Sequence, residues 1–432
     1  MVRSRGGGNT CAGQPQSSKE ECLLSNDLSR PAGTRPSPAR RRRGVVAAAM
    51  AAVTIAGLAV SGVASATAPD GKSRPVHDKE LQAGLEELVS DGSLPGMLMS
   101  VRSRDGRVTD YTAGVGDIRT KSKVPKDGYV RIASITKMFT AVAILQLVDE
   151  GELALDDTVE KVLPGVVRGT GDGAAIDGRT ITIRQLLNHT SGMPTGVPLM
   201  SQGILPIKDR YFDARELLDS SLTQAPTFAP GQDRVWDYSN AGYVLLGLVA
   251  QKVAGRPFAE VVTDRIINRI GLTETYYPGQ GDREIRAPHP RGYMMPKDAN
   301  GKPIDGELID ITRFDPSIAG AAGQMIATPS DVNKFLVALQ DGRLLKPNRL
   351  AEMRQTVATS GWPDGWRYGL GTIEMKLSCG ITAYGHGGDA DGFQTRTAIT
   401  PDGRAVTVAG TNDEVRQYEV LAFFDKALCA AK

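Results

Sequence analysis

The chain has 432 residues, of which 41% are hydrophobic and 23% charged, and its formal net charge is +2. This composition is typical of a folded globular protein and excludes a disordered, fibrous or strongly basic nucleic-acid-binding chain. The charge is uneven: residues 1–68 hold nine of the 51 basic and three of the 49 acidic residues, so 42 basic and 46 acidic residues remain, a net charge of −4.

The first 68 residues have the pattern of an export leader. The basic run Arg40–Arg43 precedes an apolar stretch over 44–60, and small residues ending at Ala66 and Ala68 follow, as in a secretory signal peptide. We expect cleavage after one of these alanines, disorder in the polar residues before position 40, and a secreted protein with one domain over 69–432. A start codon assigned too far upstream would account for those first residues. An uncleaved membrane anchor is the alternative, because the apolar stretch approaches spanning length.

The positions of cysteine and histidine bear on disulfides and metals. Cys11 and Cys22 lie in the leader, so Cys379 and Cys429 remain as an even pair in an exported chain. We expect these two to form a disulfide. No histidines and cysteines cluster at the spacing of metal ligands, so the sequence predicts neither a metal site nor a cofactor.

The mature chain is predicted to begin with a helix and a β-hairpin. Leu81, Leu85 and Leu88 recur at helical spacing and predict an amphipathic helix over 79–89. Strands over 97–101 and 108–115 flank an Asp-Gly turn, which is typical of a hairpin.

Ser134 and Lys137 form the only Ser-x-x-Lys sequence in the chain. An apolar helix is predicted over 138–148, which places Ser134 in a first turn, where unpaired N–H groups and the helix dipole favour negative charge. The two side chains then lie on one face, within reach of each other. A capping serine followed by a surface lysine is the plain alternative for so short a pattern.

The rest of the chain predicts an α+β fold. Residues 151–324 alternate helical segments with Gly- and Pro-rich loops, and we expect a largely helical insertion with helices over 183–187, 241–254 and 257–270. After a helix capped by Thr328, strands are predicted over 368–375, 381–384, 393–400 and 405–410, and a helix over 415–428. These strands and the first hairpin form one antiparallel sheet, with the first and last helices covering one face.

Two further short motifs have residue types that would complete a site around Ser134 and Lys137. Tyr238-Ser-Asn240 lies just before the apolar helix at 241, and His386-Gly387-Gly388 closes a predicted strand before Asp389. Alone, the first is also compatible with a helix cap beside a core tyrosine, and the second with a turn.

In this order, Ser-x-x-Lys, Tyr-x-Asn and His-x-Gly resemble the motifs of the penicillin-recognising serine hydrolases. The chain is similar, more narrowly, to the secreted D-alanyl-D-alanine carboxypeptidases that share the class C β-lactamase fold. The resemblance covers about 78–432 and includes Asn188-His-Thr-Ser-Gly192 and the stretch 377–386. It implies a β-lactamase/transpeptidase-like fold with an antiparallel sheet flanked by helices and a helical inserted subdomain.

The resemblance also implies roles for the motif residues, and these agree with the needs of acyl transfer. Ser134 is the expected nucleophile, and Lys137 and Tyr238 are the proton carriers, but the sequence leaves open which of the two takes the first proton. The remaining candidates are expected to bind substrate: Asn240 through an amide of the substrate, His386, Gly387 and Gly388 along a strand, and the N–H groups of Ser134 and Asp389 at the oxyanion.

One departure from the carboxypeptidase pattern bears on the substrate. The arginine that holds the terminal carboxylate in that family is missing from 371–376, and Gly387 and Asp389 replace small hydroxyl residues. Lys376 or Arg396 would be the substitutes, but the sequence does not give the direction of Arg396. We therefore expect a peptide amide or ester to be processed at least as well as the free acid.

The sequence thus predicts a secreted, monomeric serine hydrolase or acyl-transferase that acts on peptides with D-residues, such as peptidoglycan-type peptides, through a Ser134 acyl-enzyme. β-Lactams are expected as covalent ligands. A D-aminopeptidase or esterase of the same fold is the alternative enzyme. A penicillin-binding sensor or inactive paralogue is the alternative that is not an enzyme.

Overall fold

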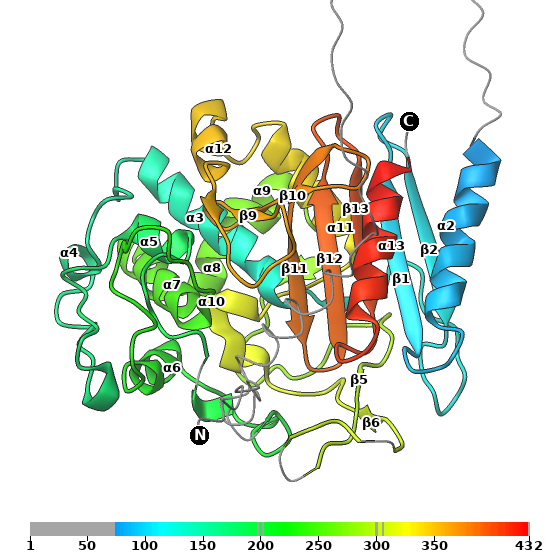
Figure 1. The fold of residues 1–432 in the computed structure, drawn as a ribbon, viewed down its shortest axis with the longest axis horizontal. Coiled ribbons are helices and arrows are strands. Elements are labelled where there is room, and N and C mark those ends of the chain that lie inside the picture. The colour runs from blue at the N-terminus through cyan, green and yellow to red at the C-terminus, as the bar shows by residue number, and fades with distance from the viewer. Residues whose placement is uncertain (1–73, 197, 201–202, 299–300, 305, 431–432) are drawn as a thin grey trace, which may run out of the picture.

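The computed structural model describes residues 74–430, except 197, 201–202, 299–300 and 305. Its centre is an eight-stranded antiparallel sheet in the order β2-β1-β13-β12-β11-β10-β9-β8 (Figure 1). The hairpin near the start of the domain pairs with the last strand, with Met97 opposite Gly410. The strands are β1 Gly96–Arg102, β2 Val108–Gly114, β8 Val357–Ala358, β9 Arg367–Tyr368, β10 Ile373–Lys376, β11 Thr382–Ala390, β12 Phe393–Ile399 and β13 Ala405–Gly410.

Helices α2 (Arg74–Leu88) and α13 (Gln417–Cys429) cover one face of this sheet and contact each other (Figure 1). The predicted leucines of α2 are buried in a cluster that includes Phe424 of α13 and Val408 of β13. Cys379, in the loop between β10 and β11, forms the predicted disulfide with Cys429. The bridge therefore joins the sheet to its last helix.

A second, larger core lies on the other face. Helix α3 (Thr136–Asp149) is buried over almost its whole length, from Thr136 to Leu147, because it runs between the sheet and the helical layer. Helix α11 (Pro329–Gln340), capped by Thr328 as predicted, packs on β1, β12 and β13. The largely apolar sequence of α3 agrees with its central position, because a helix buried on all sides is apolar on all sides.

The region predicted as a helical insertion contains short helices, long loops and small strands. Helix α7 is its longest helix and contacts α3, α5, α6 and α10. The elements of this region are α4 Val159–Val162, α5 Ile183–Leu187, α6 Ala214–Ser221, α7 Asn240–Ala254, α8 Phe258–Val262, a π-helical turn Thr263–Ile267, α9 Asn268–Ile270, β4 Thr275–Tyr276, β5 Tyr293–Met294, β6 Ile309–Asp310 and α10 Gly320–Gly323. Strands β3 (Val130–Arg131) and β7 (Ile326–Ala327) form a small sheet with β4.

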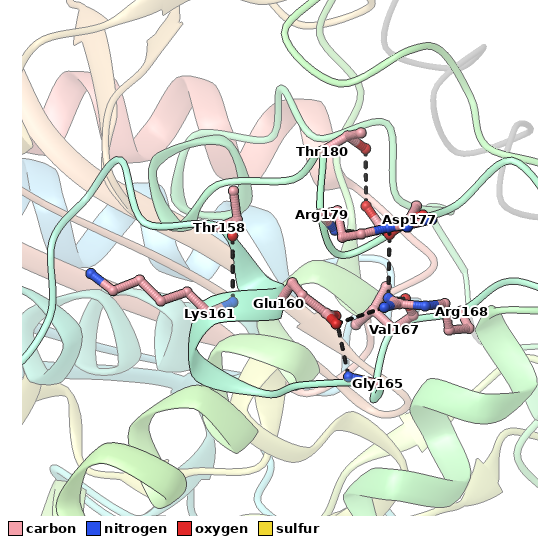
Figure 2. A network of polar contacts seen from close by, with 9 residues as sticks. All are labelled: Thr158, Glu160, Lys161, Gly165, Val167, Arg168, Asp177, Arg179 and Thr180. Carbon is pink, nitrogen blue, oxygen red and sulfur yellow. Dashed lines mark hydrogen bonds and ion pairs between the residues drawn. The ribbon is translucent and has the colours of Figure 1, made fainter.

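A polar network fixes the outer loops of this region around α4 (Figure 2). Arg168 pairs with Glu160 at 2.7 Å and with Asp177 at 3.2 Å, and Arg179 also pairs with Asp177. Thr158 caps α4 through the backbone N–H of Lys161. These charges are in contact with solvent, so the pairs contribute little to the stability of the fold.

The α+β fold predicted from the sequence is confirmed, but two strand predictions were wrong in extent. The strand predicted over 368–375 is two strands, because Gly371 adopts a φ of +79° and the chain turns between β9 and β10. The strand predicted over 381–384 continues to Ala390 as β11, because β12 pairs with it along the glycine-rich segment. The helix α12 (Pro347–Met353) was not predicted.

The predicted leader lies outside the described residues, as does the apolar stretch considered as a membrane anchor. Within the part of the chain that the structure describes, no helix is long and apolar enough to span a bilayer. The same part contains no group of three or more His, Cys, Asp or Glu side chains placed to hold a metal ion.

Candidate active site

Ser134 lies in the short turn η1 (Ala133–Ile135) that leads directly into α3. The turn begins with Ala133 at a φ of +46°, a left-handed conformation that is costly for a residue with a Cβ. The strained turn leaves Ser134 partly exposed, whereas Ala133 and Ile135 are buried. The serine is therefore presented at the surface from a rigid element.

Lys137 follows one turn later, and its side chain is completely buried. Its Nζ lies 3.0 Å from Ser134 Oγ, 2.7 Å from Asn240 Oδ1 and 2.9 Å from the carbonyl oxygen of Ala322. Burial holds the pKa of Lys137 well below its usual range, since the three oxygen atoms around its amine carry no charge to compensate a proton. A neutral amine has two N–H bonds, which can satisfy Asn240 and Ala322, and its lone pair then faces the Ser134 hydroxyl.

Tyr238 lies beside this pair, with Lys137 Nζ 4.6 Å from the centre of its ring. Burial raises the pKa of Tyr238 well above its usual range, and the nearby Ser134 hydroxyl opposes only part of that rise. Within the described structure the phenol oxygen has no partner at full hydrogen-bond geometry. The protonated phenol is therefore free to donate to a substrate atom near Ser134.

Asn240 is the first residue of α7, and Ser239 caps that helix through the N–H of Gly242, at 3.0 Å. His189, for which no role was predicted, holds this turn through two hydrogen bonds. Its Nδ1 accepts from the N–H of Ser239 at 3.1 Å, and its carbonyl oxygen accepts from the N–H of Asp237 at 3.3 Å. Only its place in the motif Asn188–Gly192 signalled it in the sequence.

Strand β11 closes the site on the other side. β10 pairs with β11 only as far as Gly385, and beyond that point β11 runs beside η1. A Cβ on Gly388 would lie 2.2 Å from the carbonyl oxygen of Ile132 and 3.1 Å from the backbone nitrogen of Ser134. The glycine therefore allows the close approach that places the Ser134 N–H near the backbone of β11.

His386 is buried in this strand and supports it from within. Its Nδ1 donates to the carbonyl oxygen of Gly387, so its Nε2 accepts from the Tyr368 hydroxyl at 3.0 Å. Burial is the main cause that lowers the pKa of His386 to about 3. The imidazole is therefore neutral at physiological pH.

The side chain of Arg396, whose direction could not be predicted from the sequence, lies beside β11. It lies opposite Gly387 on β12 and forms an ion pair with Asp389 at 2.8 Å, and it also donates to the carbonyl oxygens of Gly388 and Thr395. Arg396 therefore compensates the negative charge of Asp389. Lys376 is exposed and pairs with Thr382 at the opposite end of β11.

The structure thus brings together Ser134, Lys137, Tyr238 and Asn240 on one side and the His386–Asp389 strand on the other, from three distant parts of the chain. The family model described as "Beta-lactamase" matches residues 81–428.

The chain belongs to the beta-lactamase family.

Members of this beta-lactamase family are serine hydrolases, and the β-lactamase/transpeptidase-like fold expected from the sequence is confirmed. The chain is 35% identical to a D-stereospecific amidohydrolase from Streptomyces, with a TM-score of 0.72, over 82% of this chain and 99% of that structure. It is 28% identical to penicillin-binding protein 4 of Amycolatopsis lactamdurans, over 79% of this chain and 87% of that protein. It is 30% identical to esterase EstB of Burkholderia gladioli, over 67% of this chain and 78% of that protein.

Proposed function

We propose that this beta-lactamase-family protein is a secreted serine amidohydrolase that cleaves D-amino-acid amides, esters and peptides with an uncharged terminus through a Ser134 acyl-enzyme. The observation that carries the reaction type is the position of Lys137 Nζ between Ser134 Oγ, Asn240 Oδ1 and the Ala322 carbonyl. The similarity to a D-stereospecific amidohydrolase supports the D-configuration of the substrate.

In the proposed acylation, the lone pair of Lys137 takes the proton of Ser134 as Oγ attacks the substrate carbonyl carbon. The backbone N–H groups of Ser134 and Asp389 receive the developing oxyanion. The phenol of Tyr238 then donates its proton to the leaving nitrogen or oxygen, the bond to the carbonyl carbon breaks, and the proton held on Lys137 restores the phenol. Water attacks the acyl-enzyme by the reverse assignment of the same groups.

The proposed preference for an uncharged terminus rests on the pairing of Arg396 with Asp389. A substrate carboxylate would have to compete with Asp389 for the guanidinium, which is itself mostly buried. An amide or ester needs no such exchange. A simple carboxypeptidase role is therefore less well supported than an amidohydrolase role.

The test compares kcat/KM for matched D- and L-substrates that end in an amide, an ester or a free acid. We expect the D-amide and D-ester to be cleaved at least as well as the D-acid. The variant Asp389→Ala should shift the ratio toward the acid, because it frees Arg396 for the carboxylate and keeps the backbone N–H. A wild-type preference of about tenfold or more for the free acid, about 1.4 kcal/mol, contradicts the proposal.

An esterase is the second candidate, and the 30% identity to esterase EstB favours it. The same measurement separates the two functions. An esterase cleaves esters without cleaving D-amides, whereas an amidohydrolase cleaves both. A penicillin-binding sensor is acylated at Ser134 but turns over none of these substrates.

A further inference from the structure

The catalytic candidate Tyr238 is surrounded by rings, and one of them stands at the surface. In the described structure, five rings have centroids within 6.3 Å of its ring: His189 at 4.4 Å, Trp362 at 5.7 Å, His386 at 6.2 Å, and Trp236 and Tyr368 at 6.3 Å. Four of these side chains are at most 4% exposed. Trp362 is only partly buried, so among these rings it can meet a substrate.

The loop between β8 and β9 holds Trp362 in one orientation. Its ring lies edge-on to Trp236 at 5.1 Å and to Trp366 at 6.0 Å. Ser360 Oγ donates to the carbonyl oxygen of Trp236 at 3.0 Å, and Thr359 Oγ1 donates to that of Trp366 at 3.1 Å. The loop is thus tied both to the Tyr238 segment and to itself, and the ring is fixed before substrate binds.

Under the proposed function, Tyr238 gives its proton to the leaving group, so the leaving group passes the phenol as the bond breaks. Lys137 and Ser134 occupy the side of the acyl carbon, and the Lys137 amine lies over the rings of Tyr238 and Tyr243 rather than over Trp362. A ring beside Tyr238 is therefore placed to contact the leaving group. Planar aromatic groups pack well against an exposed, fixed indole.

We propose that Trp362 is a specificity-determining residue that binds an apolar, preferably aromatic, amine or alcohol leaving group of the substrate. The inference rests on the proposed function, because it uses Tyr238 as the proton donor. If Trp362 has this role, the site prefers substrates with benzyl or aryl leaving groups over methyl esters and simple amides that release ammonia.

The experiment measures kcat/KM for the benzyl and methyl esters of one N-acyl D-amino acid, and for two D-amino acids with small and large side chains that share one leaving group. Wild type, Trp362→Ala and Trp362→Phe are compared. We expect the benzyl-to-methyl ratio to fall about fivefold or more in Trp362→Ala and to stay within about twofold in Trp362→Phe, as for the loss and retention of one ring contact. The ratio within each variant does not depend on the fraction of active protein.

Equal losses on both esters, or a loss that follows the side chain of the acyl residue, overturn the inference. Trp366→Phe is the matched control, because Trp366 contacts Trp362 but has no ring contact with Tyr238; it should keep the wild-type ratio. Absence of wild-type turnover on every ester is a failure of the proposed function itself and is seen before any variant is compared.

Discussion

At the scale of single residues, the site depends on an amine that is held neutral. Lys137 is buried with three uncharged oxygen partners, so charging it is unfavourable. Tyr238 is buried as a neutral phenol. The lowered pKa of Lys137 and the raised pKa of Tyr238 favour Lys137 as the base and Tyr238 as the acid. The sequence could not decide between the two, because a motif does not show how deeply its residues are buried.

The lowered pKa of Lys137 predicts how stability depends on pH. Between that lowered pKa and the unfolded value of about 10.4, the unfolded chain binds one more proton than the folded chain, so stability rises with pH by up to about 1.4 kcal/mol per unit. Below the folded pKa both states are charged and this contribution stays at its lowest. Lys137→Met removes the amine, so its free energy of unfolding should rise less steeply with pH than that of wild type.

Denaturant unfolding between pH 7 and 10 measures both slopes. Lys252→Met, which removes an exposed lysine of α7, is the control and should keep the wild-type slope. Identical slopes for wild type and Lys137→Met would mean that Lys137 is charged in the folded protein, and the assignment of the base would fail.

Two neighbouring glycines of β11 make a matched pair. Gly388→Ala puts a Cβ 2.2 Å from the Ile132 carbonyl oxygen, so β11 must move away from Ser134. Gly387→Ala puts a Cβ 3.5 Å from the Arg396 side chain, an ordinary contact. We expect Gly388→Ala to lower the rate of acylation about a hundredfold or more, because a shift of about 1 Å has an effect of this size.

Gly387→Ala should stay within a few-fold of wild type in the same acylation assay. If the two variants acylate at similar rates, the close approach of β11 to Ser134 is not what positions the oxyanion donors.

At the scale of elements, the sequence predicted the helices well and the catalytic strand poorly. Leu81, Leu85 and Leu88 mark α2 by spacing alone, and Thr328 marks the start of α11. β11 contains Gly385, Gly387 and Gly388, which favour a turn locally, but the pairing with β12 outweighs that preference. The ion pair of Arg396 with Asp389 also could not be predicted, because it depends on the register between these two strands.

Removing the disulfide should lower the stability of the protein without changing its reaction. It closes a loop of 50 residues between the sheet and α13. Replacing Cys379 and Cys429 together by serine should lower the free energy of unfolding by about 2–4 kcal/mol. Activity per folded molecule should be unchanged, because Cys379 lies at the end of β11 opposite to the proposed catalytic residues. Denaturant unfolding and active-site titration measure the two quantities. A loss of activity in fully folded protein would contradict this separation.

At the scale of the whole molecule, the site lies between the central sheet and the helices packed beside it. The sheet supplies β11, α3 supplies Lys137, and the first residue of α7 is Asn240. Tyr238 precedes α7 and packs against the smaller core. The order of the three motifs predicted that these residues lie together, because the family that the motifs resemble has a fold that places them in one site. The aromatic shell with His189 and Trp362 could not be predicted, because its members come from separate loops.

Export is a prediction for the intact chain. The signal-like pattern over 40–68 should be removed on secretion, and the mature protein should begin near Thr67 or Pro69. Intact-mass measurement of protein recovered from the culture medium tests this. Protein that stays with the membrane and retains residues 44–60 would instead support the anchor.

The central claim is that Ser134 forms the acyl-enzyme, and intact-mass measurement tests it most directly. Wild type and Ser134→Ala are mixed with a penicillin and, separately, with a D-amino-acid ester, and the labelled peptide is identified after digestion. We predict one acyl group per wild-type chain, on the peptide that contains Ser134, and none on the variant. Stoichiometric labelling that persists in Ser134→Ala would contradict the account.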